Sequence, residues 1–488
     1  MKGLSIFIQT FSMKHISTFA FIFLVFSNVF SQTWVKVSAG TEYSLALKSD
    51  GTLWAWGANN YGQLGVSSPS SSNVPVQVGT DSDWKDIACG SFHILAMKAD
   101  STLWSWGFNA SGQLGLGNTT NIVTPQQIGS DHDWVQIECG TVNSAAIKAN
   151  GTLWMWGNNL YGQCGIGTTT DVLIPTQVGS ANTWKTISLG GLHALGIQEE
   201  ASQQVLYAWG FNSTGQLGLG TTTDVNVPTA VLMPVGQVLD WKSISAGFQF
   251  SSAVAQNGTA WTWGFNGNGQ LGLGDTQDRD VITQLGNLTN WNQITAGSSF
   301  AYGTLTDATQ FSWGFNGFGM LSIGTMQSQN TPYPLTLLST NINSIALAEG
   351  APSGNQLYGM HVLALSNDSL SICTVGANYT GQLGIGTTSS RNYFECDVEP
   401  ITGIDEKPSI ELSLYPNPTT GKFTLEATFE AGQQVQIFNV NGQQVYSHEI
   451  LNASIQLSFE MNLPQGLYLL KLINQEGSQI GSSRLVVE

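Results

Sequence analysis

Three histidines share one position of an internal repeat and are the residues most suggestive of metal chemistry. His93, His193 and His361 stand at this position, and three imidazoles would be enough for a catalytic zinc site. They lie in copies two, four and seven, which are not neighbours, and the other copies carry Tyr43, Asn143, Phe250 and Phe300. We therefore interpret the histidines as structural side chains and predict no metal site.

Two acidic pairs resemble the start of a calcium-binding loop. Asp81-Ser-Asp83 and Asp131-His-Asp133 have the alternation of such a loop but lack its later Gly and Glu ligands. We interpret them as aspartates that cap turns. The sequence shows no nucleophile elbow, zinc-ligand spacing, phosphate-binding loop or glycosidase-like carboxylate pair. We therefore expect a non-enzymatic protein without a cofactor.

The cysteines divide into two groups. Cys89 and Cys139 occupy one repeat position and Cys164 replaces a Leu, so we expect these three to be small buried hydrophobic residues. Cys373 and Cys396 lie in the last repeat and could form a disulfide in an oxidising compartment.

The elements that position these side chains repeat seven times. Gly-Gln-Leu-Gly or a close variant begins at residues 62, 112, 162, 215, 269, 319 and 381. Each copy follows a Trp-Gly-x-Asn element or a relative of it. An upstream run of the type Trp84–Gly90 precedes each copy as well. Three elements that recur in the same order indicate a repeat architecture.

One unit can be divided into four short strands. We expect them at Pro75–Gly79, Trp84–Gly90, Ile94–Lys98 and Thr102–Trp106, separated by turn-forming residues such as Asp and Gly. Seven such units predict an all-β, seven-bladed β-propeller with tryptophans packed between blades. The first unit lacks its own Pro-x-Gln-Val strand, so Phe394–Val398 is expected to join the first blade and close the ring.

The repeat resembles that of the regulator-of-chromosome-condensation family. The resemblance is carried by Gly90-Ser-Phe-His93 and by Trp104-Ser-Trp106-Gly-Phe-Asn109-Ala-Ser-Gly-Gln-Leu-Gly115, and it spans about residues 32–404. It implies a seven-bladed propeller. The last unit departs from the pattern, because Cys373 and Val375 replace the Trp pair and an insert lies near residues 350–358.

Strand order predicts which loops share a surface. The Gly-x-x loops and the Trp-Gly-x-Asn loops are expected on one rim, which we call the aromatic rim. Ten residues give the rim this character, Tyr61, Phe92, Phe108, Tyr161, Phe211, Phe248, Phe265, Phe315, Phe318 and Tyr379. Residues shared by the repeats usually serve the repeat. We therefore expect the seven Asn to hold turns and the Phe of Trp-Gly-Phe-Asn to pack against the next blade.

Aromatic residues at variable positions of these loops are the candidate ligand-binding residues, because exposed aromatics on loops favour binding to a protein or a sugar. The candidates are Tyr61, Phe92, Phe248 and Phe318.

Charge excludes one class of partner. The chain has 488 residues, only 10% of them charged, and a net charge of −17. Residues 32–404 alone carry 9 Lys/Arg against 23 Asp/Glu. We therefore expect no nucleic-acid binding, which relies on basic surfaces.

The N-terminus has the layout of an export signal. Residues 1–31 contain Lys2 and Lys14, an apolar run from Phe19 to Phe26, and a cleavage-like Val-Phe-Ser before residue 32. Translation could start at Met1 or at Met13. The apolar run is shorter than the ~20 residues of a membrane-spanning helix, so we expect a signal peptide and no transmembrane segment.

The C-terminus has a different composition and a second resemblance. We expect a linker at residues 405–410 and a small β-sandwich at 411–488. Leu414–Leu425, Val435–Tyr446 and Leu463–Leu472 resemble the motifs of the C-terminal sorting domain of the type IX secretion system. That resemblance implies the type IX machinery as a partner of residues 411–488. The sequence leaves open whether the tail is cleaved and the product released or anchored.

These features favour a secreted or surface-attached propeller that binds a protein or glycan ligand through its aromatic rim. An extracellular enzyme, or a module that assists processing of a polysaccharide or peptide, is the alternative. Guanine-nucleotide exchange on a small GTPase conflicts with export. The sequence does not name the ligand.

Overall fold

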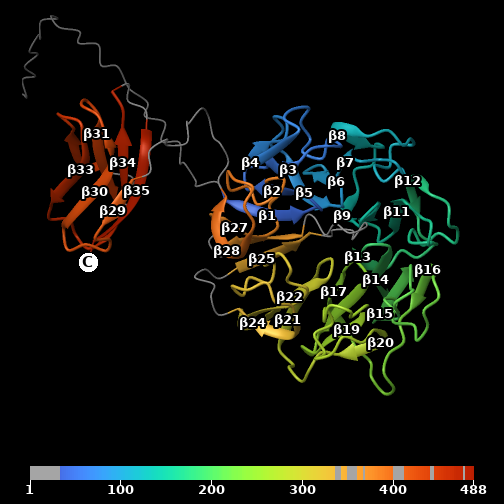
Figure 1. Ribbon diagram of the computed structural model, residues 1–488. Coiled ribbons are helices and arrows are strands. Elements are labelled where there is room, and N and C mark those ends of the chain that lie inside the picture. Colours follow the sequence, from blue (N-terminus) through green and yellow to red (C-terminus); the bar gives the residue numbers. More distant parts are fainter. Residues whose placement is uncertain are drawn as a thin grey trace, which may run out of the picture.

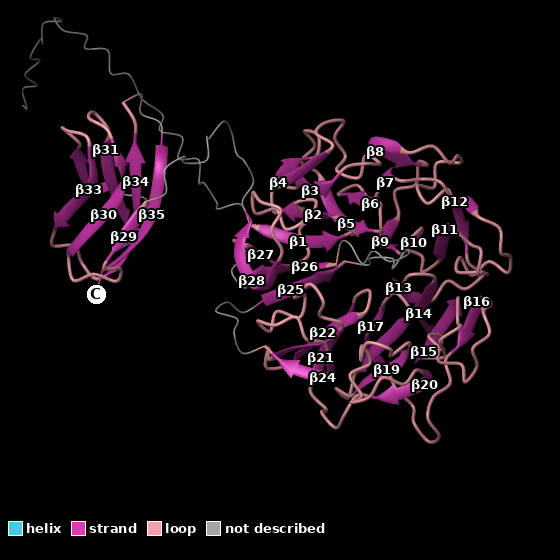
Figure 2. Cartoon of the chain, in the orientation of Figure 1, coloured by secondary structure: helices cyan, strands magenta, loops and turns pink. Residues whose placement is uncertain are grey.

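The computed structural model describes residues 33–335, 342–348, 360–366, 369–398, 412–439, 444–475 and 479–487. The predicted signal peptide, the insert near residues 350–358 and the linker at 405–410 lie outside these ranges. Within them the chain forms strands and turns without a helix (Figure 2). The all-β prediction is confirmed.

Seven four-stranded antiparallel sheets follow one another along the described chain and are arranged around a centre (Figure 1). We number them blades 1 to 7. Blade 1 contains β1 (Trp34–Ala39), β2 (Tyr43–Lys48), β3 (Leu53–Ala58) and β4 (Ser71–Gln77), and blade 2 contains β5 (Trp84–Cys89), β6 (His93–Lys98), β7 (Leu103–Gly107) and β8 (Ile122–Ile128). Blade 3 contains β9 (Trp134–Cys139), β10 (Asn143–Lys148), β11 (Leu153–Gly157) and β12 (Val172–Gln177), and blade 4 contains β13 (Trp184–Leu189), β14 (His193–Glu200), β15 (Gln203–Gly210) and β16 (Val225–Ala230). Blade 5 contains β17 (Trp241–Ala246), β18 (Phe250–Ala255), β19 (Ala260–Gly264) and β20 (Arg279–Gln284), and blade 6 contains β21 (Trp291–Ala296), β22 (Phe300–Leu305), β23 (Gln310–Gly314) and β24 (Gln329–Pro334). Blade 7 contains β25 (Ile342–Leu347), β26 (His361–Ser366), β27 (Ile372–Gly376) and β28 (Arg391–Val398).

The phase of the predicted unit is wrong by one strand. The strand that contains Pro75 is β4, and it pairs with β3 through Trp54 opposite Gln77, so it ends blade 1 and does not begin blade 2. Proline explains the assignment, because it cannot donate a ladder hydrogen bond and therefore suits an edge strand. The strand that begins with Trp84 is the first of its sheet and lines the centre of the ring.

The predicted closing strand is also wrong. Phe394–Val398 belongs to β28, which pairs with β27 of its own blade, and blade 1 already has β4 as its fourth strand. Blades 7 and 1 instead meet through side chains and backbone hydrogen bonds, such as those from Trp34 N to Ser369 O and from Gly386 N to Asn73 O, both at 2.8 Å. The ring therefore closes without exchanging a strand.

Fully buried tryptophans join consecutive blades. The Nε1 atom of Trp156 donates a hydrogen bond of 2.9 Å to the carbonyl of Gln113 in the preceding blade. Trp56 makes the same bond to Gln382 at 2.8 Å and so joins blade 1 to blade 7. Trp106, Trp209, Trp263 and Trp313 repeat the arrangement. The predicted packing of tryptophan between blades is confirmed.

A disulfide joins Cys373 of β27 to Cys396 of β28, residues that lie opposite each other in the ladder. Cys89, Cys139 and Cys164 are free and buried, as predicted. The bond links residues 23 positions apart.

Removing this disulfide should destabilise the propeller. A bridge that closes a loop of this length restricts the unfolded chain by about 3 kcal/mol in the chain-entropy model. We expect Cys373→Ala/Cys396→Ala to unfold at lower denaturant concentration than the wild type, and reduction to reproduce the change. Cys164→Ala is the control for a buried free thiol. A double variant as resistant to denaturant as the wild type would contradict this role.

The C-terminal residues form a small sandwich, as predicted. One sheet contains β29 (Ser413–Tyr415), β30 (Lys422–Phe429) and β33 (Ser454–Glu460), and the other β31 (Gln434–Asn439), β32 (Gln444–Glu449), β34 (Gly466–Ile473) and β35 (Gln479–Val487). Their facing sides share a core that includes Leu425, Ile437, Leu470 and Leu485.

Candidate ligand-binding rim

The loops predicted to share a rim do so. Because the strands of a blade are antiparallel, the loop between its first and second strands and the loop between its third and fourth strands lie at the same end of the blade. In blade 2 the two loops are joined by a hydrogen bond from Phe108 N to Phe92 O at 2.8 Å. The remaining turns lie on the opposite side, which we call the far rim.

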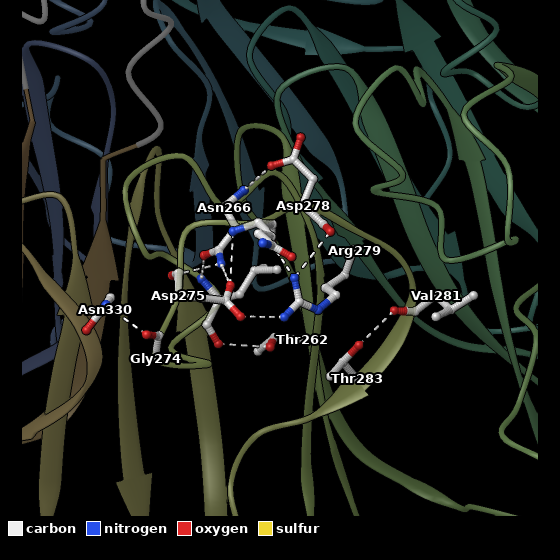
Figure 3. Close-up of polar contacts among 11 residues, drawn as sticks. Thr262, Asn266, Gly274, Asp275, Asp278, Arg279, Val281, Thr283 and Asn330 are labelled. Carbon is white, nitrogen blue, oxygen red and sulfur yellow. Dashed lines mark hydrogen bonds and ion pairs between the residues drawn. The ribbon is translucent and has the colours of Figure 1, made fainter.

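The asparagine that recurs in every repeat holds its rim loop in shape. Figure 3 shows Asn266, whose backbone N–H donates to Asp278 Oδ1 at 2.8 Å and whose side-chain amide donates to Asp275 O at 3.1 Å. Its Oδ1 accepts from the backbone N–H of Leu271 at 3.0 Å. The other six asparagines accept the same backbone hydrogen bond, and all of them are buried except Asn59, which is half-buried, so the prediction that they are structural is confirmed.

Backbone hydrogen bonds also link rim loops of different blades. Thr41 N donates to Ser91 O at 3.1 Å, and Ser91 N donates to Thr141 O at 3.2 Å. Phe248 N donates to Gly297 O at 3.2 Å on the other side of the ring. The rim is therefore a pre-organised surface, which lowers the entropy cost of binding a partner.

Two of the four candidate aromatics meet in one cluster. The ring centroid of Tyr61 lies 5.4 Å from that of Phe92 and 4.9 Å from that of Phe108. Tyr61 comes from blade 1, and both phenylalanines come from blade 2. Tyr61 is 38% exposed and the phenylalanines are half-buried.

The other two candidates lie in different blades. Phe318 contacts Phe315 in its own loop and Tyr379 in blade 7, with centroids 6.3 and 6.2 Å apart. Phe248 is half-buried, and its ring lies so close to Gly191 that a Cβ there would be 2.6 Å from it. The structure thus brings together only Tyr61 and Phe92 among the four.

Two of the four shared phenylalanines pack between blades, but in the opposite direction from the one predicted. Phe108 contacts Tyr61, and Phe211 contacts Tyr161 at 4.8 Å, so each packs against the preceding blade. Leu160, which is 63% exposed, is a rim residue that the aromatic pattern does not predict. It stands directly after a repeat asparagine, as Tyr379 does, and that position was the signal for it.

The histidines join blades and do not converge on a metal. His93 Nε2 lies 2.9 Å from Ser144 Oγ in the next blade, and that hydroxyl donates to Gln113 O at 2.9 Å. The serine must therefore accept from Nε2–H. His193 with Ser251, and His361 with Ser44, repeat the arrangement at 2.9 and 2.7 Å. In the part of the chain that the structure describes, no cluster of three potential metal ligands occurs.

The acidic pairs bind lysine, which adds to their predicted role in turns. Lys98 Nζ lies 2.7 Å from Asp81 and 3.1 Å from Asp83, and above the rings of Trp84 and Trp104. Lys148 sits in the same way between Asp131, Asp133 and two tryptophans. These carboxylates are occupied by protein cations, as expected for structural residues.

The first strand of each blade lines a polar central channel with a cavity of about 250 Å³. Lys36 and Asp86 form an ion pair there, and Glu138 faces the same cavity. Burial raises the pKa of the Glu138 carboxyl to about 7.

A second cavity, of about 570 Å³, lies between blades 5 and 6 beside Arg279, Leu285 and Phe311. Arg279 is paired there with Asp275 at 2.7 Å (Figure 3).

Comparison with known proteins gives the family. Residues 24–302 match the model of the RCC1-like domain, which is more than half of the chain. The chain belongs to the RCC1-like domain family. Members of this family are mostly regulatory or binding proteins. Residues 413–488 match the secretion system C-terminal sorting domain. The protein is therefore secreted or attached to the outer cell surface by the type IX system.

Individual relatives of this RCC1-like protein match only short segments. The ultraviolet-B receptor UVR8 of Arabidopsis thaliana is 37% identical over 75 residues, which is 15% of this chain and 17% of that protein. The secretion-regulating guanine nucleotide exchange factor of Mus musculus is 45% identical over 74 residues, 15% of this chain and 16% of that one. The chain thus matches less than a fifth of the length of these relatives.

Solved structures support the fold. Human WBSCR16 has a TM-score of 0.62 at 22% identity, over 72% of this chain and 94% of that one. Yeast RCC1 (Prp20), solved bound to Kap60, has a TM-score of 0.58 at 20% identity, over 69% and 82%. Among the described residues, no helix is long and apolar enough to cross a membrane.

Proposed function

We propose that this RCC1-like propeller is a non-enzymatic binding protein that recognises a protein or glycan ligand through its aromatic rim. The observation that carries the proposal is the cluster of Tyr61, Phe92 and Phe108, which spans two blades. Half-exposed aromatics on a rigid surface supply large contact area at low entropic cost. The rim loops supply that rigidity through their own hydrogen bonds.

A protein ligand is the better supported of the two. The rings of the cluster meet at 63° and 57°, so they form an uneven surface and not a flat platform for a sugar ring. Related propellers have been solved with or characterised for protein partners, namely Kap60, Gsp1p and histones for the yeast protein. Export of this chain argues against the same intracellular partners.

Truncating the rim should weaken binding and leave the fold intact. We expect Tyr61→Ala/Phe92→Ala to lower affinity for the native ligand at least tenfold, because central aromatic residues contribute about 2 kcal/mol or more. Phe248→Ala and Phe318→Ala test the two remaining candidates. The readout is recovery of partners from the native medium with immobilised propeller, followed by titration against the recovered protein or against a glycan panel.

Tyr333 provides a matched control. It is an aromatic residue on β24, outside the rim, and is 45% exposed. Tyr333→Ala should recover partners as the wild type does. Equal recovery by Tyr61→Ala/Phe92→Ala and by the wild type would show that the rim is not the binding surface.

A further inference from the structure

The two outward faces of the C-terminal sandwich differ in chemistry. On the three-stranded sheet, Lys422 lies opposite Glu460 and forms an ion pair of 2.7 Å. Thr424 lies opposite Ser458, with their hydroxyls 3.2 Å apart. Polar cross-strand pairs of this kind are usual where a sheet faces water. This face is therefore largely polar, although Tyr415, which lies opposite Thr424, is 44% exposed on it.

The four-stranded sheet turns apolar side chains outward. Phe438, Leu469 and Arg484 form one row across β31, β34 and β35. Leu467 and Leu469 are 48% and 40% exposed. Together with Lys471 these residues line a groove of about 400 Å³, which we call the cationic groove. An outward face that breaks the usual apolar-in, polar-out alternation marks an interaction surface.

The charge of the groove is also unusual for this protein. The Nζ atom of Lys471 lies 5.4 Å from the centroid of the Phe438 ring, and the side chain of Arg484 is exposed. Neither cation has an ion-pair partner among the residues that the structure describes. Residues 405–488 contain only 4 Lys/Arg against 9 Asp/Glu, in a chain of net charge −17. Half of the basic residues of the tail thus border one apolar groove.

We infer that the cationic groove is the surface through which the sorting domain docks onto an acidic surface of a protein of the export machinery. The exposed leucines and Phe438 supply apolar area, and the two cations complement carboxylates on the partner. Recognition of anionic lipid headgroups typically uses roughly four to eight basic residues, whereas this groove has two. The charge count therefore favours a protein partner over a lipid surface.

Charge reversal in the full chain tests the inference. In cells with an active type IX system, we expect Lys471→Glu/Arg484→Glu to reduce the amount of chain outside the cell at least tenfold. Lys471→Arg/Arg484→Lys should be exported normally. Lys422→Glu, on the opposite face, is the control for a change of charge in the same domain. Purified full-length variants should show the thermal unfolding of the wild type, which separates lost docking from lost folding.

Two results would overturn the inference. One is export of a folded Lys471→Glu/Arg484→Glu chain at the wild-type level. The other is reduced export by that variant together with lost binding to vesicles that contain lipopolysaccharide, which would assign the groove to lipid. Rim variants such as Tyr61→Ala/Phe92→Ala should be exported normally, so failure of the proposed ligand-binding function would not be mistaken for failure of docking.

Discussion

Replacing His93 and His193 together by Gln is expected to remove much of the acid sensitivity of the propeller. Burial lowers the pKa of each imidazole from its ordinary 6.5 to about 3. The folded state thus keeps both rings neutral, while the unfolded chain takes up two protons as the pH falls below about 6.5. Stability is complete above that pH and is lost progressively toward pH 3. Between pH 7 and 4.5 the loss is about 3 kcal/mol for each histidine.

The local geometry explains why protonation is unfavourable. Nε2 of each histidine is already bonded to a serine, so the added proton would sit on Nδ1, which is buried without a hydrogen-bond partner. A Gln side chain can offer an N–H to the same serine and cannot be protonated in this range. The variant should therefore keep the link between blades and lose its dependence on pH.

Denaturant unfolding at pH 7 and at pH 4.5 measures the effect. His132→Gln is the control, because His132 is exposed on the surface. Glu138 acts with the opposite sign. Its raised pKa of about 7 gives stability that is full below about pH 4.5 and is lost as the pH rises to 7. Glu138 therefore stays unchanged in all three proteins. The same pH dependence in the double variant and the wild type would contradict the assignment.

Replacing Trp156 by Ala should lower the free energy of unfolding by about 3–5 kcal/mol, the usual cost of truncating a fully buried Trp. Trp156 is fully buried between blades 2 and 3, and its Nε1 bonds to Gln113 O. The variant loses this hydrogen bond and leaves a cavity between blades 2 and 3, where contacts between blades hold the propeller together. The measurement is the denaturation midpoint of the purified propeller.

Trp154 is the matched comparison within the same strand. It is half-buried and packs beneath Lys148 near the far rim, so Trp154→Ala should cost clearly less. Trp156→Phe keeps most of the apolar area but removes the N–H donor, and its effect should be about 1–2 kcal/mol. Equal losses for Trp154→Ala and Trp156→Ala would show that the junction between blades is not the sensitive point.

The fold could be predicted because each level of the repeat points to it. Paired tryptophans, turn residues and the seven copies together define the blades. The phase of the blade was predicted incorrectly, although Pro75 held the information, because sequence order alone does not say which strand is the edge. The closing strand was misassigned for the same reason. Assigning the Pro75 strand to blade 2 left blade 1 with three strands, so a strand from the last repeat was expected to complete it.

The site was less predictable because its contacts cross between blades. Tyr61 and Phe92 are 31 positions apart, and their contact follows only from the packing of blade 1 on blade 2. The histidine–serine pairs show that a contact between two blades can be visible as a pattern in the sequence. Ser144, Ser251 and Ser44 are the second residue of the second strand in the blade that follows each histidine-bearing blade. Ile94, Ala194, Ala301 and Val362 stand at that position in the other blades.

The direction of the last propeller strand has a consequence for display of the protein. β28 runs from the aromatic rim toward the far rim, as the fourth strand of every blade does, so the chain leaves the propeller at the far rim. A protein tethered through its C-terminus is thus held from the side opposite its aromatic residues. Attachment at the far rim therefore leaves the ligand-binding candidates on the side of the propeller that carries no covalent connection to the sorting domain.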